Sequence, residues 1–207
     1  MLCGIDEAGR GPLSGPVCAA AVMLPDDFPV ERLNDSKKLN KNKRGMAEAL
    51  IYESAGAADG AVYGIGWASH EEIDALNILK ASLLAMKRAF EAIPVGKRRL
   101  IDEVVVDGRH TPDIAASGGA SGVLVHALVK ADGSVPQVMA ASILAKEARD
   151  RVMEEYAKQY PQYGYERHKG YPTKLHCERI FQYGPSPIQR KTFRVPYRIQ
   201  QIPHTSK

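Results

Sequence analysis

The sequence predicts an α/β fold, with a mixed β-sheet flanked by helices and a helical C-terminal extension. Three observations support this fold class. Apolar runs typical of strands come first, strands and amphipathic helices then alternate, and only helical patterns follow residue 137. The 207 residues are 44% hydrophobic and 25% charged, which is typical of a globular chain and excludes a mainly disordered or collagen-like one.

The first two strands are expected over residues 1–6 and 15–24, which are apolar runs separated by a glycine-rich connection. A helix over 43–55 and a third strand over 59–67 follow. Ser69 and Glu72 form a capping box. Apolar residues then recur at three- and four-residue spacing as far as Phe90, which predicts one helix of about six turns.

The second half of the chain begins with Pro94 and Gly96, which end that helix. The apolar runs Glu103–Asp107 and 123–130 are expected to be short strands. Residues 137–160 carry the pattern of a long helix. Thr173 is a suitable N-cap for a further helix that ends near residue 182.

Membrane insertion and export are not expected. The longest apolar run, over residues 17–24, has eight residues, whereas a membrane-spanning helix needs about 20. The acidic residues Asp6 and Glu7 precede that run, which argues against an export signal. The three cysteines form no C-x-x-C pair, so neither a zinc site nor a disulfide framework is indicated. We therefore expect a cytoplasmic protein with reduced thiols.

Positive charge is concentrated near the C-terminus. Residues 161–207 carry nine Lys or Arg and two acidic residues, a net charge of +7, whereas the preceding residues carry 19 basic and 22 acidic groups. This asymmetry is typical of proteins that bind a polyanion, and a solvated basic face explains it equally well. If the partner is a nucleic acid, Lys174, Arg190 and Arg194 are expected to contact phosphates.

Four carboxylates stand where apolar, strand-like runs end: Asp6 and Glu7, Asp107, and Asp132. Strands of one sheet bring their ends together, so these groups are expected to converge. Converging carboxylates repel one another unless cations lie between them. Oxygen ligands without His or Cys select hard ions such as Mg²⁺ or Mn²⁺, and a pair of such ions about 4 Å apart hydrolyses phosphodiesters. Any one of these residues, taken alone, is more typical of a turn or a helix cap.

The loop after the first strand reads GRGPLSG over residues 9–15. It matches neither G-x-G-x-x-G nor the Gly-Lys-Ser/Thr of a P-loop, and a strand rather than a helix follows it. A nucleotide-binding helix terminus is therefore not indicated. The loop is either a tight turn or a segment whose backbone amides approach a nucleic acid strand.

Six motifs, in order, resemble those of the ribonuclease HII family. They are GIDEAGRGP at residues 4–12 with GPV at 15–17, DSKKL at 35–39, VDG at 106–108, AASILAK at 140–146, HKGYPT at 168–173 and GPSPI at 184–188. Together they span about residues 2–196. Six ordered motifs over nearly the whole chain form a specific pattern, whereas each one alone is weak.

The resemblance implies a ribonuclease H-like sheet. It also implies a metal-dependent endoribonuclease that hydrolyses the RNA strand of RNA–DNA hybrids and incises DNA 5′ of an embedded ribonucleotide, leaving 3′-hydroxyl and 5′-phosphate ends. The catalytic, metal-binding carboxylates of the family correspond to Asp6, Glu7, Asp107 and Asp132, with Mg²⁺ or Mn²⁺ as cofactor. Ala131 and Glu147 depart from the family pattern, and neither departure removes a catalytic group.

Substrate contacts are expected around the same motifs. Ser142 and Lys146 lie four residues apart on one helix face, which suits a shared phosphate as well as helix packing. Tyr171 stands beside Lys169, a combination typical of stacking next to phosphates. Asp150 competes with Asp132 as fourth ligand, but its position between two arginines favours an ion pair or a capping role. The expected substrate-binding set is Gly9, Arg10, Gly11, Lys37, Ser142, Lys146, His168, Lys169 and Tyr171.

Two other functions stay open from the residues alone: a non-catalytic nucleic-acid-binding module, and a carboxylate–metal phosphatase for small esters. The expected organisation is a single domain over residues 1–207 that acts as a monomer. Residues 1–160 form its catalytic core, residues 161–196 a basic helical extension, and residues 197–207 a mobile tail.

Overall fold

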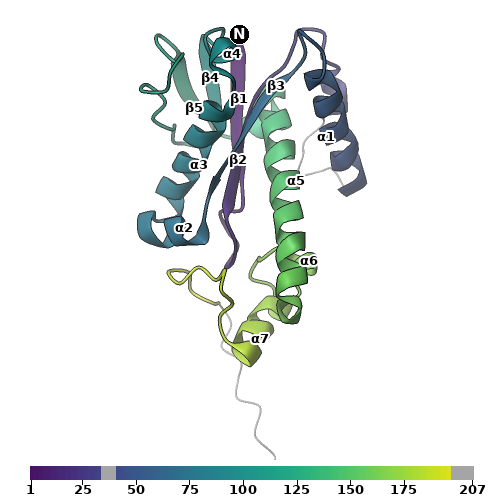
Figure 1. Cartoon of the computed structure of the whole chain (residues 1–207), viewed down its shortest axis with the longest axis vertical. Helices are drawn as coiled ribbons and strands as arrows, with labels where there is room; N and C mark the ends of the chain where they lie inside the picture. The colour runs from purple at the N-terminus through teal and green to yellow at the C-terminus, as the bar shows by residue number, and fades with distance from the viewer. Residues whose placement is uncertain (34–40, 197–207) are drawn as a thin grey trace, which may run out of the picture.

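A five-stranded mixed sheet organises the structure, a computed structural model that describes residues 1–33 and 41–196 (Figure 1). The strand order is β3-β2-β1-β4-β5. β1 pairs with β2, and β2 with β3, in antiparallel fashion, whereas β1/β4 and β4/β5 are parallel. The predicted fold class is confirmed. The strands are β1 (Leu2–Ala8), β2 (Val17–Met23), β3 (Val62–Ala68), β4 (Glu103–Asp107) and β5 (Leu124–Leu128).

Helices cover both faces of the sheet. α3 packs on one face over Ile5, Val106 and their neighbours, and α5 with α1 packs on the other over Ala20 and Val22. The alternation of side chains along each strand produces these two cores. The helices are α1 (Lys41–Ala55), α2 (His70–Leu76), α3 (Ile78–Ala92), α4 (Val95–Arg98), α5 (Pro136–Gln159), α6 (Tyr165–His168) and α7 (Lys174–Tyr183). Short 3₁₀ turns occupy Val30–Arg32, Ala131–Gly133 and Pro161–Tyr163. None of the helices in the described ranges is long and apolar enough to cross a bilayer.

The start of α5 packs unusually close to β1. A Cβ atom built on Gly4 would lie 2.3 Å from both the carbonyl carbon of Gln137 and the amide nitrogen of Val138. Only glycine permits this approach of helix backbone to strand. The contact fixes α5, and every side chain it carries, relative to the strand that holds Asp6.

The single helix predicted after Ser69 is two helices, so that expectation was wrong. The capping box is confirmed, with the Glu72 amide donating to Ser69 Oγ over 3.2 Å and the Ser69 amide donating to Glu72 Oε2 over 2.9 Å. Asn77 then leaves the helical conformation, with φ 71°, and its Oδ1 accepts the amides of Leu79 and Lys80. The asparagine side chain caps the new helix while its backbone takes this positive φ.

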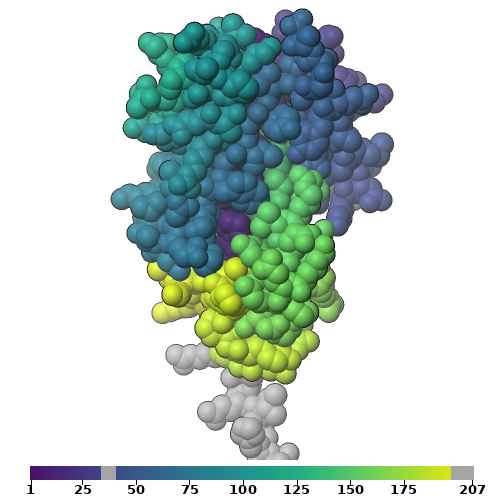
Figure 2. Space-filling model, viewed as in Figure 1, coloured from purple at the N-terminus to yellow at the C-terminus, as the bar shows by residue number. Residues whose placement is uncertain are grey.

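The extension after α5 folds back onto the lower end of that helix, as the yellow and green segments of Figure 2 show. Met153, Tyr163, Tyr165 and Ile188 form its small apolar core. It contains α6 and α7, and residues 184–196 run on without helix toward α2, where Asp74 accepts the amides of Lys191 and Thr192.

Two buried histidines, His168 and His176, join the parts of this extension. Their rings stack with centroids 4.4 Å apart. His168 Nε2 lies 2.9 Å from the Tyr163 carbonyl oxygen and must donate to it, whereas Nδ1 accepts the Gly170 amide. This arrangement requires the neutral ring. Burial lowers the pKa of both histidines, that of His176 to about 4.

We predict that acid destabilises the protein through His176. A histidine whose folded-state pKa lies below its unfolded value contributes stability above about pH 6.5, and this contribution is lost as the pH falls toward 4. The expected loss between pH 7 and pH 5 is about 2 kcal/mol. Urea unfolding across this pH range measures it. His176→Asn should flatten the slope, whereas His110→Asn, at an exposed position, should keep the wild-type slope. Equal slopes for wild type and His176→Asn would contradict the assignment.

Candidate active site

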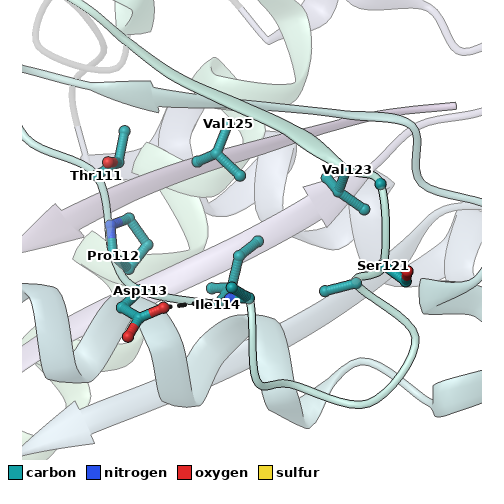
Figure 3. A pocket seen from close by; sticks show the side chains of 10 residues that line it. Thr111, Pro112, Asp113, Ile114, Ser121, Val123 and Val125 are labelled. Carbon is teal, nitrogen blue, oxygen red and sulfur yellow. Dashed lines mark hydrogen bonds between the residues drawn. The ribbon is translucent and has the colours of Figure 1, made fainter.

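Several pockets open on the described surface, and the side chains of two of them differ clearly in chemistry. The larger, of about 570 Å³, is formed by the segment between Thr111 and Val125 (Figure 3). Its single carboxylate, Asp113, accepts the amide of Ala115 over 3.3 Å. This pocket therefore presents no group of converging ionisable side chains, and we assign the chemistry to the second pocket.

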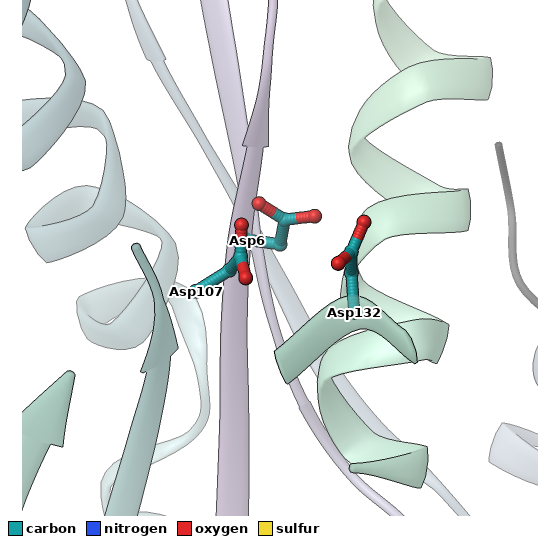
Figure 4. Close-up of side chains that lie close together, drawn as sticks. All are labelled: Asp6, Asp107 and Asp132. Carbon is teal, nitrogen blue, oxygen red and sulfur yellow. The ribbon is translucent and has the colours of Figure 1, made fainter. Parts of the chain in front are cut away.

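Strand register places two carboxylates side by side in the second pocket. β1 and β4 pair in parallel with Ile5 opposite Val106, so the next residues, Asp6 and Asp107, lie level with each other. The third carboxylate, Asp132, comes from the 3₁₀ turn Ala131–Gly133. One oxygen of each of the three lies within 4.8 Å of the others, and Figure 4 shows them facing a common point.

The structural element that carries Asp132 differs from the predicted one. The expected strand to residue 130 ends at Leu128, and Lys130 with φ 63° reverses the chain before the 3₁₀ turn. Asp132 is therefore not at a strand end. It is held by the turn that leads into α5, and it is 3% exposed.

Glu7, the fourth carboxylate expected to converge, lines the same pocket but is not one of these three. Its Oε1 accepts a hydrogen bond from Arg10 Nη1 over 3.2 Å. Burial, followed by the repulsion of Glu7, raises the pKa of Asp6 well above its usual range, and a hydrogen bond with Ser142 opposes this rise. Burial also raises the pKa of Glu7, against the opposing effect of Arg10. The cluster thus holds acids that are poorly solvated as anions.

The donor set fits a divalent cation. Glu7 Oε2 and Asp107 Oδ1 are buried and have no hydrogen-bond partner among the described residues. Buried carboxylate oxygens normally find a partner, and a cation bound between the carboxylates would supply one. All the donors are oxygens, which suits a hard ion.

The pocket beside the carboxylates has a volume of about 450 Å³. A Cβ atom on Gly11 would lie 3.6 Å from the Tyr171 ring, so the glycine loop and Tyr171 form one wall. Ser142 and Lys146 from α5 and Arg44 from α1 form the opposite side. The lining residues are Asp6, Glu7, Ala8, Gly9, Arg10, Gly11, Arg44, Asp107, Ser142, Lys146 and Tyr171.

Asp132 is one of the three converging carboxylates, whereas Asp150 is not. Asp150 forms an ion pair with Lys146, one helical turn away on α5, and it lies outside the carboxylate group. Burial lowers the pKa of Lys146 despite this partner. The ion pair predicted for Asp150 is confirmed, although its partner is Lys146 rather than an adjacent arginine.

His168 and Lys169 do not line the pocket, in contrast to the other predicted contacts on this side. His168 is buried and uses both ring nitrogens within the extension. Lys169 Nζ pairs with Glu154 over 2.9 Å. Both residues shape the segment that leads to Tyr171. The predicted contact Lys37 lies outside the described residues.

Three arginines near the site occupy places that the sequence did not predict. Arg44 lines the pocket, with its Nε donating to Glu147 over 2.8 Å. Arg149 and Arg190 are fully buried behind the glycine loop, so the expectation that Arg190 contacts phosphate is corrected. The spacing of Arg149 from Ala141 and Ala145, eight and four residues, is the signal that places it on the buried face of α5.

Comparisons with known proteins agree with this geometry. A family model described as Ribonuclease HII matches residues 3–198. Ribonuclease HII from Treponema denticola is 51% identical over 204 residues, covering 94% of this chain and 98% of that protein. Ribonuclease HII from Shewanella halifaxensis is 46% identical, covering 92% and 86%.

Solved structures show the same fold. The structure of the PCNA:RNase HII complex from Archaeoglobus fulgidus matches with a TM-score of 0.70 and 25% identity, over 97% of this chain and 98% of that one. The ribonuclease H2 from Pyrococcus horikoshii matches with a TM-score of 0.65 and 30% identity, over 94% of both chains. The acidic pocket, the family model and the relatives agree: the chain belongs to the ribonuclease HII family and is an endoribonuclease with ribonuclease H activity.

Proposed function

We propose that the protein hydrolyses the RNA strand of RNA–DNA hybrids and incises duplex DNA on the 5′ side of an embedded ribonucleotide. The products would carry 3′-hydroxyl and 5′-phosphate ends. The observation that supports this best is the position of the acidic cluster, which opens directly into a pocket walled by the Gly9-Arg10-Gly11 loop and Tyr171. A site for chemistry on phosphodiesters and a site for a sugar thus lie side by side.

Asp6, Glu7, Asp107 and Asp132 would hold the cation, which we propose is Mg²⁺ or Mn²⁺. When bound, such an ion lowers the pKa of water and neutralises charge on the phosphodiester. The hydrogen bond between Ser142 and Asp6 orients the central carboxylate. Because Asp6 and Glu7 are poorly solvated as anions, cation binding relieves an unfavourable charge distribution already present in the fold.

Cationic side chains around the pocket would bind the backbone of the nucleic acid. Arg10, Arg44 and Lys146 all line it. Lys146 is partly desolvated, which strengthens its interaction with an incoming phosphate. Its ion pair with Asp150 holds the ammonium group close to α5.

The 2′-hydroxyl of the ribonucleotide would be read by the glycine loop together with Tyr171. This hydroxyl both donates and accepts, and it is what distinguishes RNA from DNA at one position. Tyr171 is 39% exposed, so its ring and hydroxyl are available to a sugar. His168 contributes indirectly, since its Nδ1 accepts the Gly170 amide beside Tyr171.

We further propose that the protein acts as a cytoplasmic monomer with a single domain, in which residues 161–196 extend the core. All four carboxylates come from one chain, so the site requires no second copy. The three cysteines are buried and form no disulfide among the described residues, which agrees with a reducing compartment.

A fluorescent DNA duplex with one ribonucleotide tests this function. We expect a single incision in Mg²⁺ and none after EDTA.

Asp132→Asn should reduce the rate by at least about 1,000-fold because an amide keeps the shape but loses the charge that holds the cation. Asp150→Asn, the matched control, should cleave and mainly lower stability. A dead Asp150→Asn protein beside an active Asp132→Asn protein would reverse the assignment. Binding without cleavage by the wild type would indicate a binding module instead.

We predict that Tyr171 contributes its ring more than its hydroxyl group. Tyr171→Ala should lose most single-turnover activity on an embedded ribonucleotide while binding plain DNA nearly as before, and Tyr171→Phe should fall between it and the wild type. Tyr183→Ala is a suitable control, because Tyr183 is similarly exposed, at 48%, and lies on α7. Wild-type rates from a folded Tyr171→Ala protein would refute the role.

Exposed cations of the extension are expected to set the salt dependence of binding. Lys174 and Arg194 are exposed there. Their double Ala variant should lower the slope of log K against log salt by roughly 2, without moving the incision site. The control is Lys97→Ala with Arg99→Ala, on and directly after α4 at the opposite end of the molecule (Figure 1), and it should keep the slope. An unchanged slope in the first variant would mean that the extension does not face the duplex.

A further inference from the structure

Two arginines, Arg149 and Arg190, lie inside the protein without acidic partners. They are 1% and 0% exposed, and neither forms an ion pair with a carboxylate in the described ranges 1–33 and 41–196. A buried charge is unfavourable unless polar groups replace its water. Burial lowers the pKa of Arg190 to about 9, which leaves it charged at neutral pH. Backbone carbonyl groups therefore replace water around the guanidinium group of Arg190.

Arg190 binds the glycine loop at four points. Its Nη2 donates to the carbonyl oxygens of Gly9 over 2.6 Å and Pro16 over 3.3 Å. Its Nη1 donates to that of Arg10 over 3.0 Å and its Nε to that of Gly15 over 2.9 Å. One side chain thus joins both ends of the loop, which only a planar fork of donors permits.

Arg149 connects the same loop to the segment of Tyr171. It donates to the carbonyl oxygens of Pro16, Ser14 and Lys169 over 2.9, 3.2 and 3.0 Å. Its Cζ lies 5.9 Å from the centre of the Tyr171 ring. Gly9, with φ +102°, leaves room for it, because a Cβ atom there would lie 2.1 Å from Arg149 Nε.

The direction of these hydrogen bonds fixes the direction of the loop amides. In a trans peptide the C=O and N–H groups point in opposite directions, and the described chain contains no cis peptide. The carbonyls of Gly9 and Arg10 point inward to Arg190, so the amides of Arg10 and Gly11 point away from it. Neither amide donates to another group of the described chain, and both residues line the pocket.

We propose that Arg149 and Arg190 are positioning residues for ribonucleotide recognition. By binding the carbonyls of residues 9–16, they turn the amides of Arg10 and Gly11 into the pocket and hold Tyr171 beside them. This inference rests on the proposed function, in which the loop and Tyr171 read the 2′-hydroxyl. Arg149 and Arg190 themselves lie behind the loop and act through it.

The test uses Arg190→Lys and Arg149→Lys, which keep the positive charge and remove the planar guanidinium group with its several N–H donors. Single-turnover incision of a duplex with one ribonucleotide should fall about 100-fold, the usual effect of a displacement near 1 Å. The rise in Tm caused by Mn²⁺ should match the wild type, because the carboxylates stay in place. Tyr165→Phe is the control: it removes the 2.6 Å hydrogen bond to Ser186 in the same extension and should retain the rate. Wild-type rates in both Lys variants would overturn the proposal, whereas an inactive wild type would overturn the proposed function instead.

A double-mutant cycle and an exchange measurement separate positioning from general stability. If Arg149 acts through Tyr171, Arg149→Lys should slow a Tyr171→Ala protein little further, whereas fully multiplicative losses would contradict this.

Hydrogen exchange on the Asp132→Asn protein requires no arginine variant. A duplex with one ribonucleotide should protect the amides of residues 10 and 11 more than an all-DNA duplex does. Equal protection by the two duplexes would refute the orientation proposed for these amides.

Discussion

The close approach of α5 to β1 at Gly4 is the constraint on which the rest of the structure depends. With no Cβ between them, the helix starts almost in contact with the strand backbone. The turn just before α5 carries Asp132, and successive turns of α5 carry Ser142, Lys146 and Arg149. A helix displaced by the width of a methyl group would shift all of them relative to Asp6.

Charges of opposite sign are buried a short distance apart and are kept from neutralising each other. Asp6 and Asp107 lie on one side of the glycine loop, while Arg149 and Arg190 lie on the other and are solvated by carbonyls. If the arginines paired with the acids instead, the carboxylates would be unavailable to a cation. The loop backbone therefore separates the carboxylates from the two arginines that hold it in place. Both groups are required for the proposed chemistry.

Much of the fold could be predicted because local patterns decide it. The strand Glu103–Asp107 was predicted with its observed bounds, and the pairing of Asp6 with Asp107 followed from carboxylates placed after apolar strands. Three features needed tertiary information. Asn77 breaks a helix whose apolar spacing continues through it, because its own side chain caps the next helix.

The other two features concern charged and titratable side chains. Arg190 looked like part of a basic, solvated segment, since nothing local distinguishes an arginine that faces carbonyls from one that faces water. His168 stands between Arg167 and Lys169, which suggested phosphate contact, yet its ring is buried against His176. The assigned roles of the pocket residues stay predictions until the variants are measured.

The contact between Arg190 and the loop also affects the order in which parts of the site become available during synthesis of the chain. The acidic cluster uses residues 6–132, whereas the loop carbonyls at Gly9 and Arg10 are held by a side chain about 180 positions later, at sequence separations of 181 and 180. A nascent chain thus contains all the proposed metal ligands well before it contains the side chain that is proposed to shape the sugar-reading surface. A chain that terminates before residue 190 lacks that surface. A truncated product of this kind would keep the proposed metal ligands and lack the proposed support for reading the sugar.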